Sequence, residues 1–230
     1  ARYLGFTDFV KQELVQFSAA SNHRSLPSII DGLKPSQRKV LYACFKKFPE
    51  RTTASKKRQQ RSSKEQVRKS TSSDGGSSLF GSTAVGGNEV KVAQLAGYIS
   101  EQTAYHHGEK SLQMTIVKMA QTFVGASNLP LLYPSGQFGT RIHGGSDAAS
   151  ARYIFTKLDQ KARLLFPAED LPLLSYAFDD GMQVEPNEFV PIIPYVLCNG
   201  SEGIGTGWSC SFPMYNPLDV IERLLNRLKG

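Results

Sequence analysis

Residues 136–156 read Gly-Gln-Phe-Gly-Thr-Arg-Ile-His-Gly-Gly-Ser-Asp-Ala-Ala-Ser-Ala-Arg-Tyr-Ile-Phe-Thr. This stretch combines four glycines with three cationic or potentially cationic side chains. Glycine permits tight turns and lets a backbone approach another molecule closely. Arg141, His143 and Arg152 place positive charge on this flexible frame. The segment therefore suits an anion, and a polymer of phosphates is one candidate.

Arg152 is followed directly by Tyr153, and Ile154 and Phe155 form an apolar anchor behind them. A tyrosine hydroxyl has a reference pKa near 10, so it is a poor nucleophile unless a base or a cation assists it. Arg152 could stabilise the phenolate and could also neutralise charge on a phosphate under attack. The alternative is an ordinary strand tyrosine beside a surface arginine.

Two helical stripes precede this segment. Residues 92–99 and 112–123 each repeat apolar side chains at helical spacing, and the turn between them contains Gly108. Two helices joined by a short turn resemble a helix-turn-helix, and the glycine-rich hairpin at 133–156 would add a wing. These elements predict a winged-helix domain. The predicted stripes consist of Val92, Leu95, Ala96 and Ile99, and of Leu112, Ile116, Met119 and Phe123.

Two further helices are expected near the start of the chain. The first, at 7–20, has an apolar stripe and is interpreted as a packing helix. The second begins near Pro35, because proline is tolerated in a first helical turn. Val40, Leu41, Cys44 and Phe45 form its expected buried stripe. Lys34 and Arg38 lie together on another face, which by itself indicates solvated charges.

From about residue 164 the chain changes to short β-like runs, and Asp179-Asp180-Gly181 predicts a hairpin turn. Asp179, Asp180, Glu185 and Glu188 fall in turns without the spacing that converges carboxylates, so no metal site is expected. Residues 199–208 form a glycine-rich loop around one isoleucine, Ile204. Such a side chain is either tucked into a core or used as a wedge between base pairs. A helix is expected at 217–228.

The formal net charge of +7 is unevenly distributed. Residues 50–70 alone carry +6, in a segment at 48–88 that is rich in Ser, Gly, Lys and Arg and poor in large apolar groups. Such a composition predicts disorder. This insertion could tether DNA, act as a localisation signal or serve as a solvated linker.

Cys44, Cys198 and Cys210 lack metal-ligand spacing and are interpreted as buried or half-buried thiols of a reducing compartment. His106 and His107 are adjacent and therefore do not share one face, so zinc is not expected. The apolar run at 189–198 is short and interrupted by Pro191 and Pro194, which argues against a membrane span. The chain begins at Ala1 without a recognisable signal or transit peptide, as expected for an excised piece of a soluble intracellular protein.

Long motifs along the chain resemble eukaryotic type IIA DNA topoisomerases in the order found in that family. They cover nearly all of the chain except 48–88. The motifs Gly-Gln-Phe-Gly-Thr-Arg and Glu-Gly-Ile-Gly-Thr-Gly-Trp resemble those of the eukaryotic enzymes more than those of bacterial gyrase. Ala151 departs from the family, in which proline is frequent before the arginine. The motifs lie at 25–45, 90–124, 136–156 and 191–210.

The resemblance implies an α+β fold, with a winged-helix DNA-cleavage domain followed by the β-rich beginning of a tower domain. The implied divisions are an N-terminal helix and connector at 1–25, the winged-helix domain at 26–160 with its insertion at 48–88, and the tower portion at 161–230.

The resemblance also implies roles for individual residues. Tyr153 matches the nucleophile and Arg152 the group that stabilises the transition state. Ile204 matches the isoleucine that intercalates and bends DNA. The remaining implied catalytic residues are Arg24, His106 and His107, and the implied DNA contacts are Lys34, Tyr105, Ser111 and Arg141; a surface or core role for the two histidines is the alternative.

The implied activity is ATP-dependent cleavage, strand passage and religation of double-stranded DNA through a 5′-phosphotyrosine. The family works in the nucleus as a homodimer, with Mg²⁺ held by an acidic cluster of a preceding domain. Neither that cluster nor a Gly-Lys phosphate loop for ATP occurs in this sequence, so both cofactors are expected to bind elsewhere, with no membrane involved. The alternative from another class is a non-catalytic winged-helix module in which Tyr153 only contacts phosphate.

Overall fold

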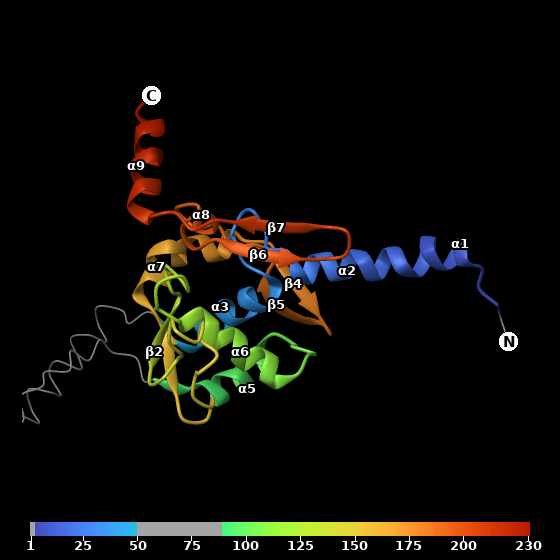
Figure 1. Ribbon diagram of the computed structural model, residues 1–230, viewed down its shortest axis with the longest axis horizontal. Coiled ribbons are helices and arrows are strands. Elements are labelled where there is room, and N and C mark those ends of the chain that lie inside the picture. Colours follow the sequence, from blue (N-terminus) through green and yellow to red (C-terminus); the bar gives the residue numbers. More distant parts are fainter. Residues whose placement is uncertain (1–2, 50–88) are drawn as a thin grey trace, which may run out of the picture.

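Three helices and a small sheet form the centre of the molecule (Figure 1). The structure is a computed structural model that describes residues 3–49 and 89–230. The sheet has the antiparallel order β1-β3-β2, so that β3, the strand after the glycine-rich loop, lies in the middle. Helices and sheet together make the predicted winged helix. Their bounds are α3 (Pro35–Lys47), α5 (Val92–Gln102), α6 (Glu109–Ala120), β1 (Val90–Lys91), β2 (Leu132–Ser135) and β3 (Phe155–Leu158).

The wing is the long connection between β2 and β3. Leu132 pairs with Leu158 and Ser135 with Phe155, which brings the two ends of the loop together. On the other edge of β3, Lys91 pairs with Phe155, immediately before α5 begins. This register places residue 153 at the junction of the wing, the sheet and α5.

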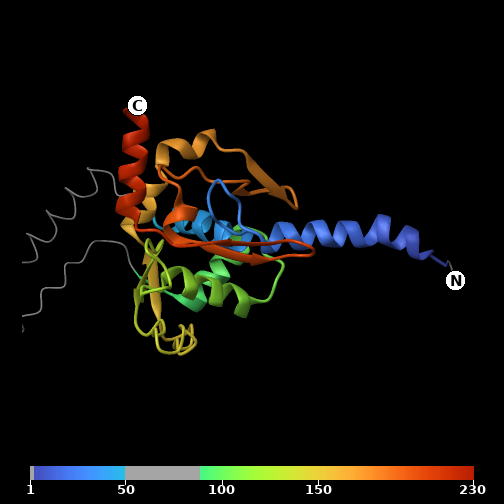
Figure 2. The ribbon, with the colours of Figure 1, turned by 45° about the horizontal axis from the view of Figure 1, so that its top comes forward.

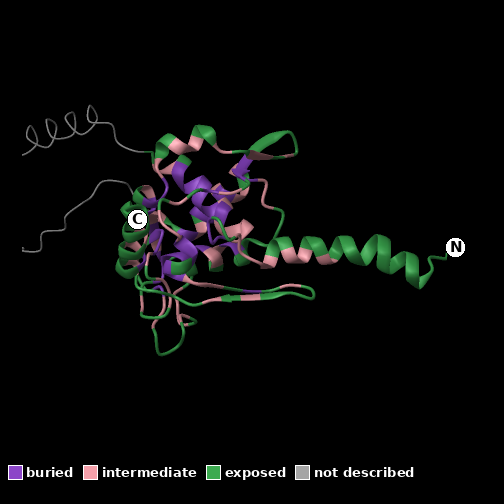
Figure 3. Cartoon of the chain, turned by 90° about the horizontal axis from the view of Figure 1, so that it is seen from above, coloured by how far each residue is buried: buried purple, intermediate pink, exposed green. Residues whose placement is uncertain are grey.

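The core lies where the three helices meet (Figure 3), and it confirms the predicted stripes of α3 and α5. Val40, Leu41, Leu95 and Ile99 are fully buried. Phe123, which was expected to extend the stripe of α6, lies beyond the helix, because α6 ends at Ala120. The basic insertion predicted at 48–88 falls, from residue 50 onward, outside the described residues. Phe48 packs against the core instead of belonging to a solvated segment.

The first predicted helix is longer than expected, and its apolar stripe, Val10, Leu14 and Phe17, is exposed. It forms a rod from α1 (Phe6–Asp8) through a π-helical segment (Phe9–Leu14) to α2 (Val15–Ser25), which projects away from the body (Figure 1). None of its residues is buried. The interpretation as a packing helix is therefore wrong for this chain.

The C-terminal part lies over the helical centre as two hairpins and short helices (Figures 1 and 2). Asp180 and Gly181 both have positive φ, as a tight type I′ hairpin requires, which confirms the predicted turn. Ile204 does not lie in an irregular loop, because it ends a strand of the second hairpin. The elements are α7 (Gln160–Leu165), the 3₁₀ helix Ala168–Leu173, β4 (Tyr176–Asp179), β5 (Met182–Pro186), α8 (Tyr195–Asn199), β6 (Ser201–Ile204), β7 (Ser209–Phe212) and α9 (Pro217–Leu228).

A buried ion pair joins this part to the winged helix. Arg38, which the sequence pattern places among solvated charges, is 5% exposed and donates from Nε to Asp31 Oδ2 at 2.7 Å. Its Nη2 donates to the other oxygen of Asp31 and to the carbonyl of Leu33. The carboxylate of Asp31 also accepts from the backbone N–H groups of Leu33 and Phe189. The prediction for Arg38 is wrong because a partner seven residues away was not visible in the helical pattern.

The three thiols are free, with Cys44 and Cys198 buried and Cys210 half-buried, as predicted. Burial raises the pKa of Cys44 to about 12. Among the helices that the structure describes, none combines the length and apolar character that crossing a bilayer requires.

The buried ion pair predicts a large stability effect. Asp31→Ala leaves the guanidinium of Arg38 buried without its partner, and we expect the free energy of unfolding to fall by about 3–5 kcal/mol. Urea unfolding followed by circular dichroism measures the change. Asp8→Ala, at an exposed position on α1, is the control and should change the value by no more than about 0.5 kcal/mol. A loss below about 1 kcal/mol for Asp31→Ala would contradict the assignment.

Candidate functional site

The turn at 151–154 has a fixed backbone and free side chains. The first two N–H groups of α5 donate to it, Val92 N to the carbonyl of Ile154 and Ala93 N to that of Ala151, both at 3.0 Å. The N–H of Tyr153 closes the turn on the carbonyl of Ser150 at 2.9 Å. These bonds satisfy donors that a helix N-terminus otherwise leaves unpaired.

Between those two carbonyls, Arg152 and Tyr153 project outward. Tyr153 is 71% exposed, whereas Ile154 beside it is 2% exposed and anchors the turn in the core. The guanidinium carbon of Arg152 lies 5.8 Å from the centre of the Tyr153 ring. The structure thus brings a phenol and a guanidinium together on a rigid turn that a large ligand can reach.

The wing beside this turn is held from inside. The side chain of Gln121, which follows α6, donates to the carbonyls of Phe138 and Gly145. At the wing's base, Asp147 accepts from the backbone N–H and the hydroxyl of Thr140, each at 2.8 Å. Arg141 and His143 remain exposed on the loop. Gln121 and Asp147 were missed in the sequence because nothing in the local pattern indicates what a lone polar side chain contacts across the fold.

Tyr105, His106 and His107 lie in the turn between α5 and α6, and Ser111 lies in the first turn of α6. The rings of Tyr105 and His107 meet edge to face with centres 5.4 Å apart. His106 Nε2 lies 3.3 Å from Asp179 Oδ2 at the end of β4. His107 and Ser111 are exposed. The two histidines therefore have different environments, with His106 next to a carboxylate and His107 in edge-to-face contact with a tyrosine ring.

His106, Asp179 and Asp180 form a cluster whose possible ligand atoms all lie within 4.8 Å of one another. The sequence pattern did not suggest it, because His106 is far from the hairpin along the chain. Mg²⁺ prefers oxygen ligands in a near-octahedral arrangement, and a partly exposed cluster with one imidazole does not fit that preference. We therefore assign no magnesium to it.

Arg24 and Ile204 lie on two elements that contact each other, the end of α2 and the second hairpin. Arg24 is exposed in the last turn of α2, and Ile204 is 84% exposed at the end of β6. Asn22 joins the two elements, since its side chain accepts from the N–H of Thr206 and donates to the carbonyl of Thr206. Gly203 lies so close to α2 that an added Cβ would stand 2.5 Å from the carbonyl oxygen of Ser25.

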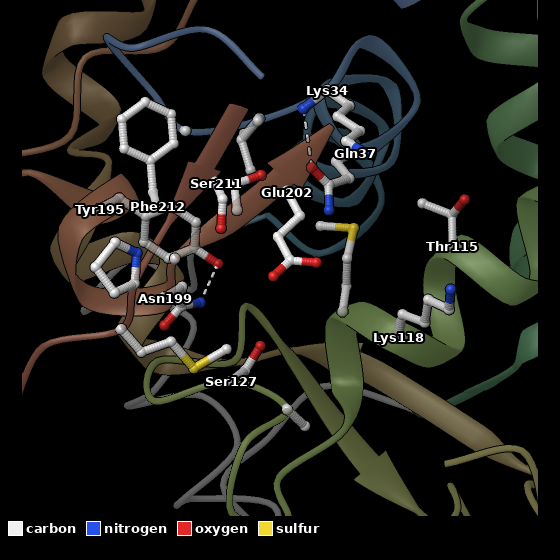
Figure 4. Close-up of a pocket in the computed structure, with 18 of the residues that line it drawn as sticks. Lys34, Gln37, Thr115, Lys118, Ser127, Tyr195, Asn199, Glu202, Ser211 and Phe212 are labelled. Atoms are coloured by element: carbon white, nitrogen blue, oxygen red, sulfur yellow. Dashed lines mark hydrogen bonds between the residues drawn. The ribbon is translucent and has the colours of Figure 1, made fainter. Parts of the chain in front are cut away.

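Lys34 lies at the start of α3, next to a groove of about 780 Å³ that runs between α3, α6 and the base of the second hairpin (Figure 4). Lys118 of α6 and Glu202 of β6 line the same groove. Lys118 was missed in the sequence, although one signal was available: Ser111, Thr115 and Lys118 recur at i, i+4 and i+7 and so share one face of α6.

These features define a winged-helix module that presents an arginine–tyrosine pair at the base of a glycine-rich wing. Comparison with known proteins narrows this class. The sequence model of the family described as the A subunit of DNA gyrase/topoisomerase IV matches residues 24–64 and 79–230, and the chain belongs to this family of type IIA DNA topoisomerases.

Eukaryotic proteins are among its relatives. The chain is 51% identical to the mitochondrial DNA topoisomerase 2 of Dictyostelium discoideum and 48% identical to human DNA topoisomerase 2-beta, over 98% and 100% of its length. It spans only 15% and 12% of those two proteins. A crystal structure of the DNA-binding, cleavage and re-ligation domain of Plasmodium falciparum topoisomerase II is similar, with a TM-score of 0.74 and 45% identity, over 97% of this chain and 26% of that one.

The wing predicts one position where alanine is not tolerated. Gly139 has φ +100°, and an added Cβ would lie 2.6 Å from the backbone of Gly145. We expect Gly139→Ala to displace the wing, seen as large changes in the NMR amide shifts of residues 137–149. Gly144→Ala is the matched control, since Gly144 also has positive φ but an added Cβ meets nothing within 4 Å. Equal perturbation by both variants would refute the close contact.

The Asp147–Thr140 contact predicts a pH dependence. The backbone N–H of Thr140 lowers the pKa of the Asp147 carboxyl below its ordinary value of 3.8. A lowered pKa means that the contact stabilises the wing above pH 3.8 and is lost as the pH falls through the lowered value. The amide proton of Thr140 should follow this titration by NMR, and the dependence should vanish in Asp147→Asn. A midpoint above 3.8 would contradict the contact.

Proposed function

We propose that this chain is the DNA-cleaving module of a type II DNA topoisomerase and that Tyr153 is its nucleophile. The observation that carries the proposal is the exposure of Tyr153 beside Arg152 on a turn whose backbone is fixed by α5. A nucleophile for duplex DNA must reach a phosphate of a bulky polymer, and a buried phenol could not do so.

The proposed reaction is a transesterification. Tyr153 Oη forms a bond to a backbone phosphorus, and the bond from that phosphorus to the 3′ oxygen breaks. The phenol loses one proton and the departing 3′ hydroxyl gains one, so the step is balanced and its reverse reseals the strand. Arg152 stabilises negative charge on the phosphate in the transition state. We propose this role for Arg152 because its guanidinium lies beside the phenol.

The other proposed contacts lie on several separate elements of the chain. His106 and His107 both act near the reacting phosphate, with His106 positioned by its contact with Asp179 and His107 by its contact with Tyr105. Ile204 enters the stacked bases, because a largely exposed isoleucine at a hairpin tip has the form of an intercalating wedge. The proposed contacts with the DNA backbone are Arg24, Lys34, Tyr105, Ser111 and Arg141.

We propose that the complete enzyme is an ATP-dependent nuclear homodimer that cuts double-stranded DNA, passes a second duplex and reseals the first. Mg²⁺ and ATP bind to parts of the enzyme other than these 230 residues. The support is indirect: the relatives are named DNA topoisomerase 2, although one of them is mitochondrial. Within this assembly, the proposed divisions of the chain are 1–25, 26–160 and 161–230.

A non-catalytic DNA-binding winged helix is the second candidate, since the exposed wing and helices suit phosphate binding without chemistry. The two candidates differ in one product, which is a covalent link between protein and DNA.

The test is Tyr153→Phe in the full-length protein that carries this chain. The wild type should form a covalent 5′ adduct with duplex DNA in the presence of Mg²⁺, trapped by denaturation with detergent. The variant should form none, because only the oxygen nucleophile is missing, while its DNA affinity should stay within about twofold.

Tyr133→Phe is the matched control, because Tyr133 is 44% exposed on β2 of the same sheet. It should leave the adduct unchanged. Absence of an adduct from the wild type would favour the non-catalytic module, and an adduct that survives in Tyr153→Phe would refute the assignment of the nucleophile. The 230-residue chain alone should bind DNA weakly and cleave it negligibly.

A further inference from the structure

The groove beside Lys34 is distinct from the turn that carries Tyr153. Three parts of the chain meet there: the start of α3, the second half of α6 with the loop after it, and the base of the β6–β7 hairpin. Its volume of about 780 Å³ far exceeds that of a single bound water or ion. Lys34 and Thr115 line it together with Lys118, Glu202 and Ser211.

The charged side chains that line this groove, Lys34, Lys118 and Glu202, sum to +1. Among residues 3–49 and 89–230, the ion pairs within 4.0 Å include neither Lys34 nor Lys118. Glu202 likewise forms no such pair in this part of the chain, and Figure 4 shows its side chain projecting into the groove. Two ammonium groups without carboxylate partners make the groove attractive to an anion.

The shape favours a long anion over a small one. The strand β6 that supplies Glu202 ends two residues later at Ile204, so groove and exposed wedge lie on one continuous hairpin. On the opposite wall, Thr115 and Lys118 line the groove, and Ser111 continues the same face of α6 toward its first turn. The two elements that line the groove, α6 and β6, therefore also carry two of the proposed DNA contacts, Ser111 and Ile204.

We propose that this groove binds the sugar–phosphate backbone of duplex DNA, with Lys118 as a phosphate contact and Glu202 as an opposing charge that weakens the contact. The proposal rests on the proposed function, because it takes DNA as the partner. It goes beyond that function by assigning two residues with effects of opposite sign. A carboxylate in a phosphate groove lowers affinity, which helps an enzyme that must release its product.

The experiment compares Lys118→Ala and Glu202→Gln in the full-length protein, with a labelled duplex of about 30 base pairs at several salt concentrations. Lys118→Ala should weaken binding by about 3- to 10-fold at low salt and reduce the slope of log K against log salt by about 0.9, the value for one phosphate contact. Glu202→Gln should strengthen binding by about 2- to 5-fold, because it removes one repulsive charge.

Charge-matched controls lie on the projecting C-terminal helix. Lys229→Ala and Glu222→Gln make the same charge changes at exposed positions on or just after α9, away from the groove. They should leave both the affinity and the salt slope within error of the wild type. Equal unfolding temperatures for all four variants would show that the fold is intact.

The outcomes separate the two proposals. If the wild type binds duplex but Lys118→Ala and Glu202→Gln behave like their controls, the groove assignment is wrong and the proposed function stands. If millimolar inorganic phosphate raises the unfolding temperature of the wild type and not of Lys118→Ala, while both bind the duplex equally, a free anion is the occupant and the assignment is also overturned. If the wild type shows no salt-dependent binding of duplex, the proposed function itself fails.

Discussion

The buried carboxylate of Asp31 is the contact on which the arrangement of this molecule depends. It lies before α3, receives two bonds from Arg38 of that helix, and accepts the backbone N–H of Phe189 from the C-terminal part. A buried charge with fewer partners would cost several kcal/mol. The same carboxylate bonds the winged helix through Arg38 and the C-terminal part through Phe189. The position of the hairpins relative to the winged helix is therefore fixed next to the start of α3, where Lys34 lies. Lys39 adds a second link, since its ammonium bonds Glu185 of β5 and the carbonyl of Thr103.

The turn at 151–154 and the wing share one feature: hydrogen bonds fix their backbone, while the side chains proposed to act on DNA are exposed. The turn at 151–154 satisfies the first donors of α5, and Ile154 fills the core, so Arg152 and Tyr153 are presented without being packed. The wing is held by Gln121 and Asp147 through its own carbonyl and N–H groups. Such sites lose little conformational entropy when a ligand arrives, because only the exposed side chains still have to be ordered.

Much of this fold was predictable where the signal is local. The stripes of α3 and α5, the Asp-Gly turn after β4 and the wing hairpin follow from spacing and turn chemistry, and the structure confirms them. Arg38 was misplaced because its partner lies outside the helical repeat. The rod at the N-terminus was wrongly expected to pack, since an apolar stripe indicates that a face can be buried and does not say what covers it. Ile204 was expected in a loop, because the glycines on either side of it, Gly203 and Gly205, are typical of loops. In the structure these two positions lack side chains because the end of α2 lies too close to leave room for a Cβ.

Residue order along the chain was enough to specify the stripes of the helices, the arginine–tyrosine pair and the isolated isoleucine, because each depends on neighbours within a few positions. The pairing of His106 with Asp179, the burial of Arg38 and the groove shared by Lys118 and Glu202 arose from folding alone. These contacts join residues that the local pattern does not connect, and their geometry depends on how helices and hairpins pack. The periodicity of a sequence indicates which face of a helix or strand is apolar. It does not indicate the distance between polar groups on different elements, because that distance is set by how the elements pack.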